Sequence, residues 1–136
     1  MTRLFLIIQT LTIIFLSGCS GNSTQEIWEG VSDNTLRVII SEYFPYHEIG
    51  DSDSIKLSVR ERLDQRGYLL IASYIVMNLD KSKGSHEVDT LFNSLMDEAI
   101  KQGKIIHTDC SESNCRAMGE YNISEILKTL ESINNK

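Results

Sequence analysis

The segment KIIHTDCSESNCRAMGEYN, residues 104–122, decides the fold class. It contains two short extended runs on either side of SESN, and Ser and Asn are residues that favour turns. The segment therefore predicts a β-hairpin, with Cys110 and Cys115 on either side of a four-residue loop.

An earlier segment predicts a third strand. TLRVIIS, residues 35–41, is short and rich in β-branched residues, and it places Leu36, Val38 and Ile40 on one side. The following residues, EYFPYHEIGDSDS, contain the only proline of the chain together with a glycine and several acidic residues. This composition predicts a loop.

The region from about Ile55 to Leu79 predicts a long helix. Its first half is amphipathic, with Val59 and Leu63 one turn apart. We expect a solvated face made by Arg60, Glu61, Arg62 and Asp64. After Gly67 the segment is apolar almost all round, so it must be covered on most sides or contact something else. Its β-branched residues also fit a buried strand, and helix is the prediction; these residues are Ile71, Ile75 and Val76.

Two further helices have clear apolar stripes. Ser85 is the expected N-cap of the first, and Lys101 followed by Gly103 suits its end. Its stripe consists of Val88, Leu91, Phe92, Leu95, Met96, Ala99 and Ile100. The second helix opens at Asn122 or Ser124 and carries Ile123, Ile126, Leu127, Leu130 and Ile133.

The predicted element order is therefore β-α-α-β-β-α. This order is typical of an α+β fold, here a two-layer sandwich with helices packed on one face of a small antiparallel sheet. A chain of 136 residues has room for about one domain, which we place at residues 35–136. The net charge of −6 argues against a nucleic-acid partner, because phosphate binding needs clustered Lys and Arg.

The amino terminus predicts export. Arg3 supplies a short positive segment, and residues 4–16 form an apolar run interrupted only by Gln and Thr. This run of thirteen residues is shorter than the roughly 20 that a spanning helix needs, so it predicts a cleaved signal peptide over residues 1–18. The alternatives are an ordinary secretory signal with an incidental cysteine and an uncleaved anchor.

The stretch LSGC, residues 16–19, resembles the lipobox of bacterial lipoproteins. The resemblance implies that the chain is cut before Cys19 and that this cysteine carries a diacylglycerol and further acyl chains such as palmitate. Two or three chains hold a protein firmly in a bilayer, whereas one holds it only reversibly. Because Ser20 is not Asp, the resemblance favours the outer membrane over the inner one, on its periplasmic or surface side.

Residues 19–34 are rich in Ser, Gly and Asn and predict a lipidated cysteine followed by a flexible tether. Ile27 and Trp28 interrupt its polarity. We expect them to dock on the domain or to lie at lipid headgroups, and a contact with a partner is the alternative.

The remaining two cysteines predict a disulfide. Once Cys19 carries lipid, Cys110 and Cys115 form one pair in an oxidising compartment, and a hairpin brings facing Cβ atoms close enough to bond. A redox role is the alternative, which the four-residue spacing and the scarcity of nearby basic residues disfavour.

Patterns typical of catalysis or metal binding are incomplete. His47-Glu48 and His86-Glu87 each lack a second histidine four residues after the first. Residues 51–56, DSDSIK, have Ile55 and Lys56 where a calcium loop needs an oxygen ligand and a glycine. We therefore predict neither an enzyme, nor a metal site, nor a cofactor.

The sequence predicts a lipid-anchored envelope protein that acts by binding or scaffolding. A small-ligand or substrate-binding periplasmic module is the alternative. Tyr43, Phe44 and Tyr46 surround a proline and form a possible interaction site with an envelope protein, although they also suit the end of a small core. Residues 35–121 resemble small outer-membrane lipoproteins of the LPP20 type, in which a strand precedes a long helix and the chain returns in a strand. That resemblance implies no catalytic residues.

Overall fold

The computed structural model describes residues 28–43, 52–111 and 114–136. Four strands form one antiparallel sheet in the order β1-β2-β4-β3, with bounds Gly30–Ser32, Thr35–Tyr43, Asn114–Asn122 and Lys104–Cys110 respectively. Three α-helices accompany it, α2 (Ser52–Asn78), α3 (His86–Lys101) and α4 (Ser124–Asn134), with a 3₁₀ turn at Lys81–Lys83. The predicted α+β class and antiparallel sheet are confirmed.

The two central strands build the floor of the core. All nine residues of β2 pair with β4, from Thr35 opposite Asn122 to Tyr43 opposite Asn114. Leu36, Val38 and Ile40 are buried on the helix-facing side, as the alternation of β2 predicted. On β4 the same side carries Cys115, Ala117, Gly119 and Tyr121, all buried.

The predicted tether ends earlier than expected. Residues 30–32 form β1, which pairs with the start of β2 through a two-residue turn at Asp33 and Asn34. Asp33 has a φ of 53°, a conformation that Asp tolerates better than most residues. The correction to the predicted tether, 19–34, is therefore that its last residues belong to the folded domain.

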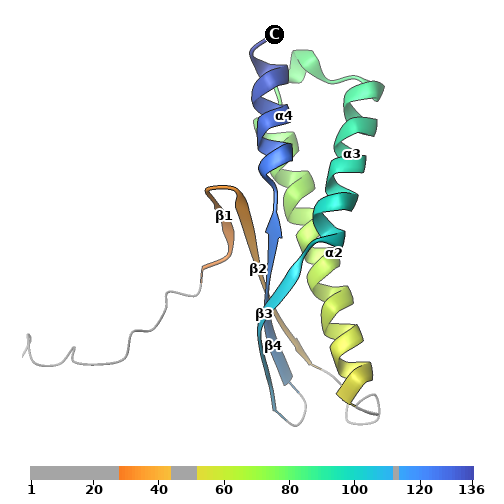
Figure 1. The fold of residues 1–136 in the computed structure, drawn as a ribbon, viewed down its shortest axis with the longest axis vertical. Coiled ribbons are helices and arrows are strands. Elements are labelled where there is room, and N and C mark those ends of the chain that lie inside the picture. The colour runs from red at the N-terminus through yellow and green to blue at the C-terminus, as the bar shows by residue number, and fades with distance from the viewer. Residues whose placement is uncertain (1–27, 44–51, 112–113) are drawn as a thin grey trace, which may run out of the picture.

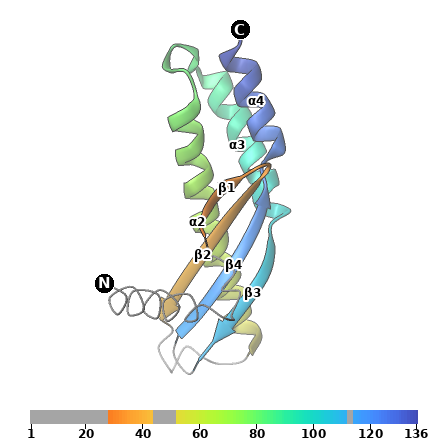
Figure 2. The same cartoon turned by 90° about the vertical axis from the view of Figure 1, so that its left-hand side faces the viewer.

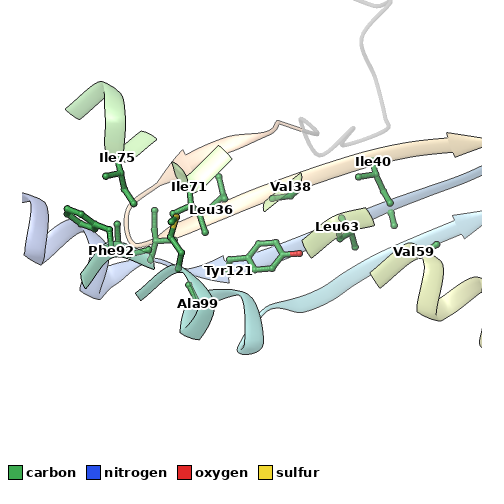
Figure 3. Packing of buried hydrophobic residues seen from close by; sticks show 14 of the residues in the cluster. Leu36, Val38, Ile40, Val59, Leu63, Ile71, Ile75, Phe92, Ala99 and Tyr121 are labelled. Carbon is green, nitrogen blue, oxygen red and sulfur yellow. The ribbon is translucent and has the colours of Figure 1, made fainter. Parts of the chain in front are cut away.

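Helix α2 contributes to two parts of the core. Its first half packs on the sheet, and its second half packs with α3 and α4 above the end of the sheet (Figure 1). Val59 and Leu63 accordingly lie along the strands, whereas Ile75 lies on the side of Phe92 of α3 and Ile71 lies between them, near Leu36 of β2 (Figure 3). The predicted helix is confirmed through residues 68–78, and it starts three residues earlier than the expected Ile55. With 27 residues, α2 is about 40 Å long.

The other two helices begin and pack as expected. Ser85 is the N-cap of α3, and its Oγ accepts a hydrogen bond from the backbone N–H of Val88 at 3.2 Å. The Asn122 side chain accepts a bond from the N–H of Ser124 at the start of α4. Their buried residues come from the predicted stripes and are Phe92, Met96, Ala99, Ile126 and Leu130.

One part of the expected solvated face is wrong. Arg60 and Asp64 are half-buried. The Arg60 guanidinium donates hydrogen bonds to the Asp64 carboxylate and to the carbonyls of Gly103 and Ile100, and so connects α2 to the end of α3. Arg60 thereby binds carbonyl groups at the C-terminal end of α3, where the helix dipole favours a cation. Asp64 Oδ1 also accepts a 2.9 Å bond from the Tyr121 hydroxyl.

Tyr121 is the largest fully buried side chain, and its ring occupies a space left by three glycines. A Cβ built on Gly67, Gly103 or Gly119 would meet the ring, most severely at Gly103. Burial of the phenol, and then its hydrogen bond to Asp64, raise the pKa of Tyr121 above its usual value. The hydroxyl therefore stays protonated and keeps donating to Asp64.

The hairpin of β3 and β4 ends at the two cysteines. Cys110 and Cys115 are the last register pair, and their sulfur atoms lie at disulfide distance, 2.08 Å, in agreement with the prediction. Cys115 is buried on the helix-facing side, while every residue of β3 is exposed at the edge of the sheet (Figure 2). A bulge between Ile105 and His107 interrupts the β3 ladder.

Reduction of this disulfide is expected to lower the free energy of unfolding by about 2 kcal/mol, because so short a loop restricts the unfolded chain only modestly. Urea denaturation with and without dithiothreitol measures the effect. The variant Cys110→Ser/Cys115→Ala is the control, since it has no disulfide and its unfolding midpoint should not change with dithiothreitol; alanine is used at position 115 because Cys115 is buried. A wild-type curve that does not move with dithiothreitol would contradict the prediction.

Candidate interaction surface

The residues predicted for function fall partly outside the described residues. Cys19, Phe44 and Tyr46 lie outside them, so the structure does not place these side chains. Tyr43 is the last residue of β2, and 67% of its surface is exposed, so this ring does not cover the core. The cysteine pair lies at the same end of the sheet.

Three strongly exposed apolar side chains gather on one face of the second half of α2, apart from Leu57, which is exposed on another side of its first half. Leu69, Val76 and Met77 are 67%, 74% and 83% exposed. They are separated by seven and eight residues, and Ser73 lies between them, so they share one side of the helix. We call Leu69, Val76 and Met77 the α2 apolar face. The opposite side of the same segment, at Ile71 and Ile75, is buried.

The surroundings of the α2 apolar face contain little charge. Residues 67–79 include no Asp, Glu, Lys or Arg. Charged residues of both signs border this stretch. Arg62, Asp64 and Arg66 precede it, and Asp80, Lys81 and Lys83 follow it. Asp80 is the nearest acidic residue at the second end, and its carboxylate accepts bonds from the N–H and hydroxyl of Ser82, which lower its pKa.

Glu29, near the start of the described residues, is bonded to α2 close to Leu69. The Glu29 carboxylate makes two hydrogen bonds with the Arg66 guanidinium, at 2.6 and 2.7 Å, and accepts a third from the N–H of Ile39. The Arg66 hydrogen bond is the main reason that the pKa of Glu29 is lowered. Glu29 therefore fastens the segment before β1 to α2, one turn from Leu69.

Trp28 is also docked on the domain, which was one of the two expected outcomes. The Arg37 guanidinium lies 4.8 Å from the centre of the Trp28 ring and pairs with Glu120 at 2.6 Å. A cation over an indole ring is a favourable contact. The residues at the start of the described chain are thus held at two points, on β2 and on α2.

A shallow groove of about 530 Å³ adjoins the α2 apolar face. It is open to solvent and lies between α2 and the end of α3, and it is lined by Asp64, Gln65, Tyr68, Leu69 and Ile100. The Asp64 carboxylate is its only charged group, and both of its oxygens already accept hydrogen bonds from Arg60 or Tyr121. The groove therefore offers mainly apolar contact.

A second apolar groove, of about 280 Å³, runs along the exposed edge of the sheet. Ile105 and Thr108 of β3 line one side of it, and Ile55 and Val59 of α2 line the other. Within residues 28–43, 52–111 and 114–136, no group of three or more His, Cys, Asp or Glu side chains is placed to hold a metal ion. Among the helices described, none is both long and apolar enough to cross a membrane.

No protein-family model matches the chain, and neither curated proteins nor solved structures show a significant similarity to it. The candidate surface therefore rests on this chain's own residues. The sequence shows the uncharged run at residues 67–79. It does not show which side chains of that run face solvent. The contact between Glu29 and Arg66 left no sequence signal, because it joins residues 37 positions apart.

Proposed function

We propose that the protein is anchored in the cell envelope by lipid on Cys19 and that its domain acts there by binding or scaffolding. The outer membrane, on its periplasmic or surface side, is the proposed location. The anchor is supported by Arg3, the apolar run at 4–16 and the LSGC stretch. The binding role is carried by one observation, the exposed α2 apolar face.

Exposed apolar side chains in a stripe contribute little to folding. A single exposed leucine is ordinary, but neighbouring large apolar residues on one face mark contact with another molecule. Most of the other apolar side chains of residues 67–79 are buried or pack against the core. The exposure of Leu69, Val76 and Met77 is therefore not a general property of this segment. It is confined to the side of α2 that no other described element covers.

A small-ligand module is the second candidate, and the 530 Å³ groove is the observation that favours it. Ligand pockets of this size combine apolar walls with a few polar groups that fix orientation, and they enclose most of the ligand. This groove is open, and Asp64 is engaged within the protein. The arrangement therefore supports binding of a surface better than binding of a small molecule.

Labelling in cells tests both parts of the proposal. Radiolabelled palmitate should enter the wild-type protein and not Cys19→Ala, and equal labelling of the two would reject the anchor. In the same cells, a photo-crosslinking residue at position 76 should form adducts with a lipid or a protein. Position 61 is the matched control, because Glu61 is exposed on the same helix but not apolar. Equal adduct yields at 61 and 76 would reject the binding role.

A further inference from the structure

We propose that the β3 edge of the sheet is a surface for self-association, where β3 of a second copy of the chain pairs antiparallel with β3 about a two-fold axis at His107. The product is one continuous sheet that runs through both copies. This inference depends neither on the α2 apolar face nor on lipid at Cys19, and it names a partner that the proposed function leaves open.

The first argument is that β3 is an open edge. It stands at one end of the strand order β1-β2-β4-β3, and among the described strands only β4 pairs with it (Figure 2). The free side of such a strand presents backbone N–H and C=O groups with which another strand can pair. Every side chain of β3 is exposed, including the large apolar ones of Ile105 and Ile106. An added strand would therefore form hydrogen bonds and cover apolar surface at the same time.

The second argument is the groove beside this edge. The groove of about 280 Å³ runs between Ile105 and Thr108 of β3 and Ile55 and Val59 of α2, and its walls are mainly apolar. Alternate side chains of a strand point to the same face of a sheet, so half of those on an added strand point toward the helix layer. The groove offers these side chains an apolar place. In the two-fold pair, each copy supplies Ile105 and Thr108 to cover the groove of the other.

The third argument is the position of the charges on β3. Lys104 is opposite Glu120 of β4 and Asp109 is opposite Arg116, on the face of the sheet that turns away from the helices. Residues five apart on a regular strand lie on opposite faces, but the bulge at Ile106 adds one residue and brings Lys104 and Asp109 to the same face. Facing residues of an antiparallel pair also share a face. Lys104 of one copy and Asp109 of another therefore meet the geometric requirement for direct contact.

The fourth argument is charge complementarity in this register. When His107 faces His107 of the second copy, Thr108 faces Ile105 and Asp109 faces Lys104, each twice by symmetry. In the described part of the chain, neither Lys104 nor Asp109 makes an ion pair. Opposite charges directly across a ladder stabilise it, so self-association gives both side chains a partner.

The new pairs also continue a row of alternating charge across the sheet. Arg37 of β2 binds Glu120 of β4 at 2.6 Å, and Glu120 is opposite Lys104 of β3. In the two-fold register the row continues into the second copy with Asp109 and then Arg116. A lysine on an edge strand ordinarily hinders pairing with other strands. Here it favours the chain's own β3, because that strand places a carboxylate opposite it.

Disulfide trapping tests the two-fold register. The full chain carrying His107→Cys is purified in detergent and oxidised with copper phenanthroline, and covalent dimers are measured on a non-reducing gel. Facing residues of an antiparallel pair have Cα atoms about 4.5 to 5.5 Å apart, which suits a disulfide. The wild type is one control and reports bonding through the native cysteines. Val76→Cys is the matched control, because position 76 is exposed on α2.

We expect His107→Cys to give at least about fivefold more covalent dimer than either control, because the proposed axis brings its two thiols together. Equal yields from His107→Cys and Val76→Cys would indicate random collision and overturn the proposal. A high yield from Val76→Cys alone would overturn it too, by placing the second copy on the α2 apolar face.

An exchange of charges between copies tests the ion pairs separately from folding. Lys104→Glu and Asp109→Lys are each combined with His107→Cys and carry tags of different length. Either variant alone sets like charges opposite each other twice, which destabilises the pair. A mixture of the two variants restores opposite charges at both places, but only between unlike copies.

We expect each variant alone to form at least about fivefold less covalent dimer than His107→Cys, and the mixture to recover that yield as a heterodimer. A defect within one chain is not repaired by mixing, so recovery reports contact between copies. The proposal fails if the mixture forms no more heterodimer than the separate variants form homodimer, or if each variant alone dimerises as well as His107→Cys.

Discussion

Replacing Gly103 with alanine is expected to destabilise the protein by about 3 kcal/mol, because the added methyl group has no room. Its Cβ would lie 2.5 Å from Cδ1 of Tyr121, closer still to Cε1, and 3.1 Å from the carbonyl oxygen of Ile100. The ring is fully buried and its hydroxyl is bonded to Asp64, so it cannot move aside without losing that bond. Urea denaturation followed by circular dichroism measures the loss.

Gly119 provides the matched control for Gly103. A Cβ on Gly119 would meet the same ring at 3.4 Å, an ordinary contact distance. We therefore expect Gly119→Ala to change stability by no more than about 1 kcal/mol. If the clash with the ring is the cause, Gly103→Ala should cost less in a Tyr121→Leu background than in the wild type. Equal stabilities of Gly103→Ala and Gly119→Ala would refute the explanation.

Truncation to alanine is expected to affect stability very differently at two leucines of α2 that lie six residues apart. Leu63 is fully buried between α2 and the sheet, so Leu63→Ala should destabilise by about 3 to 4 kcal/mol through lost burial and the cavity left behind. Leu69 is 67% exposed, so Leu69→Ala should change stability by no more than about 0.5 kcal/mol. Midpoints of urea unfolding for the two variants give the comparison directly.

This comparison bears on function as well as on stability. A neutral Leu69→Ala variant that lowers the yield of crosslinked adducts from position 76 would show that Leu69 serves contact rather than folding. A loss of stability comparable to that of Leu63→Ala would instead place Leu69 in the core and remove the reason for proposing an interaction surface. The two variants share one helix and one residue type, so helix propensity cancels between them.

Most secondary structure was predictable because it depends on local periodicity. The alternation of Leu36, Val38 and Ile40 and the stripe of α3 with its Ser85 cap are statements about neighbouring residues. The missed strand β1 has only three residues, too few for alternation to be visible. Its signal was the pair Asp33-Asn34, which suits a tight turn between two strands and was interpreted as part of a flexible tether.

The network of Arg60, Asp64 and Tyr121 could not be predicted from periodicity. Charged residues at helical spacing ordinarily form a solvated face. Here the end of α3 packs beside α2 and gives Arg60 the carbonyls of Ile100 and Gly103, and β4 brings the Tyr121 hydroxyl to Asp64. The exposed side of segment 67–79 was hidden for a similar reason. Buried residues of α2 recur every four positions, at Val59, Leu63, Gly67, Ile71 and Ile75, so the buried side drifts around the helix.

The pairing of β2 with β4 has a consequence for how the protein is made. Partners in this ladder are separated by about 70 to 90 residues, whereas the β1–β2 and β3–β4 hairpins pair residues that are close in the sequence. Sheets built from such distant pairs fold slowly. The central sheet therefore cannot assemble until almost the whole chain has been synthesised, and residues 67–79 emerge before α3, β4 and α4 exist to cover them. Segment 67–79 is therefore fully exposed to solvent during synthesis, and three of its apolar side chains, Leu69, Val76 and Met77, stay exposed after folding.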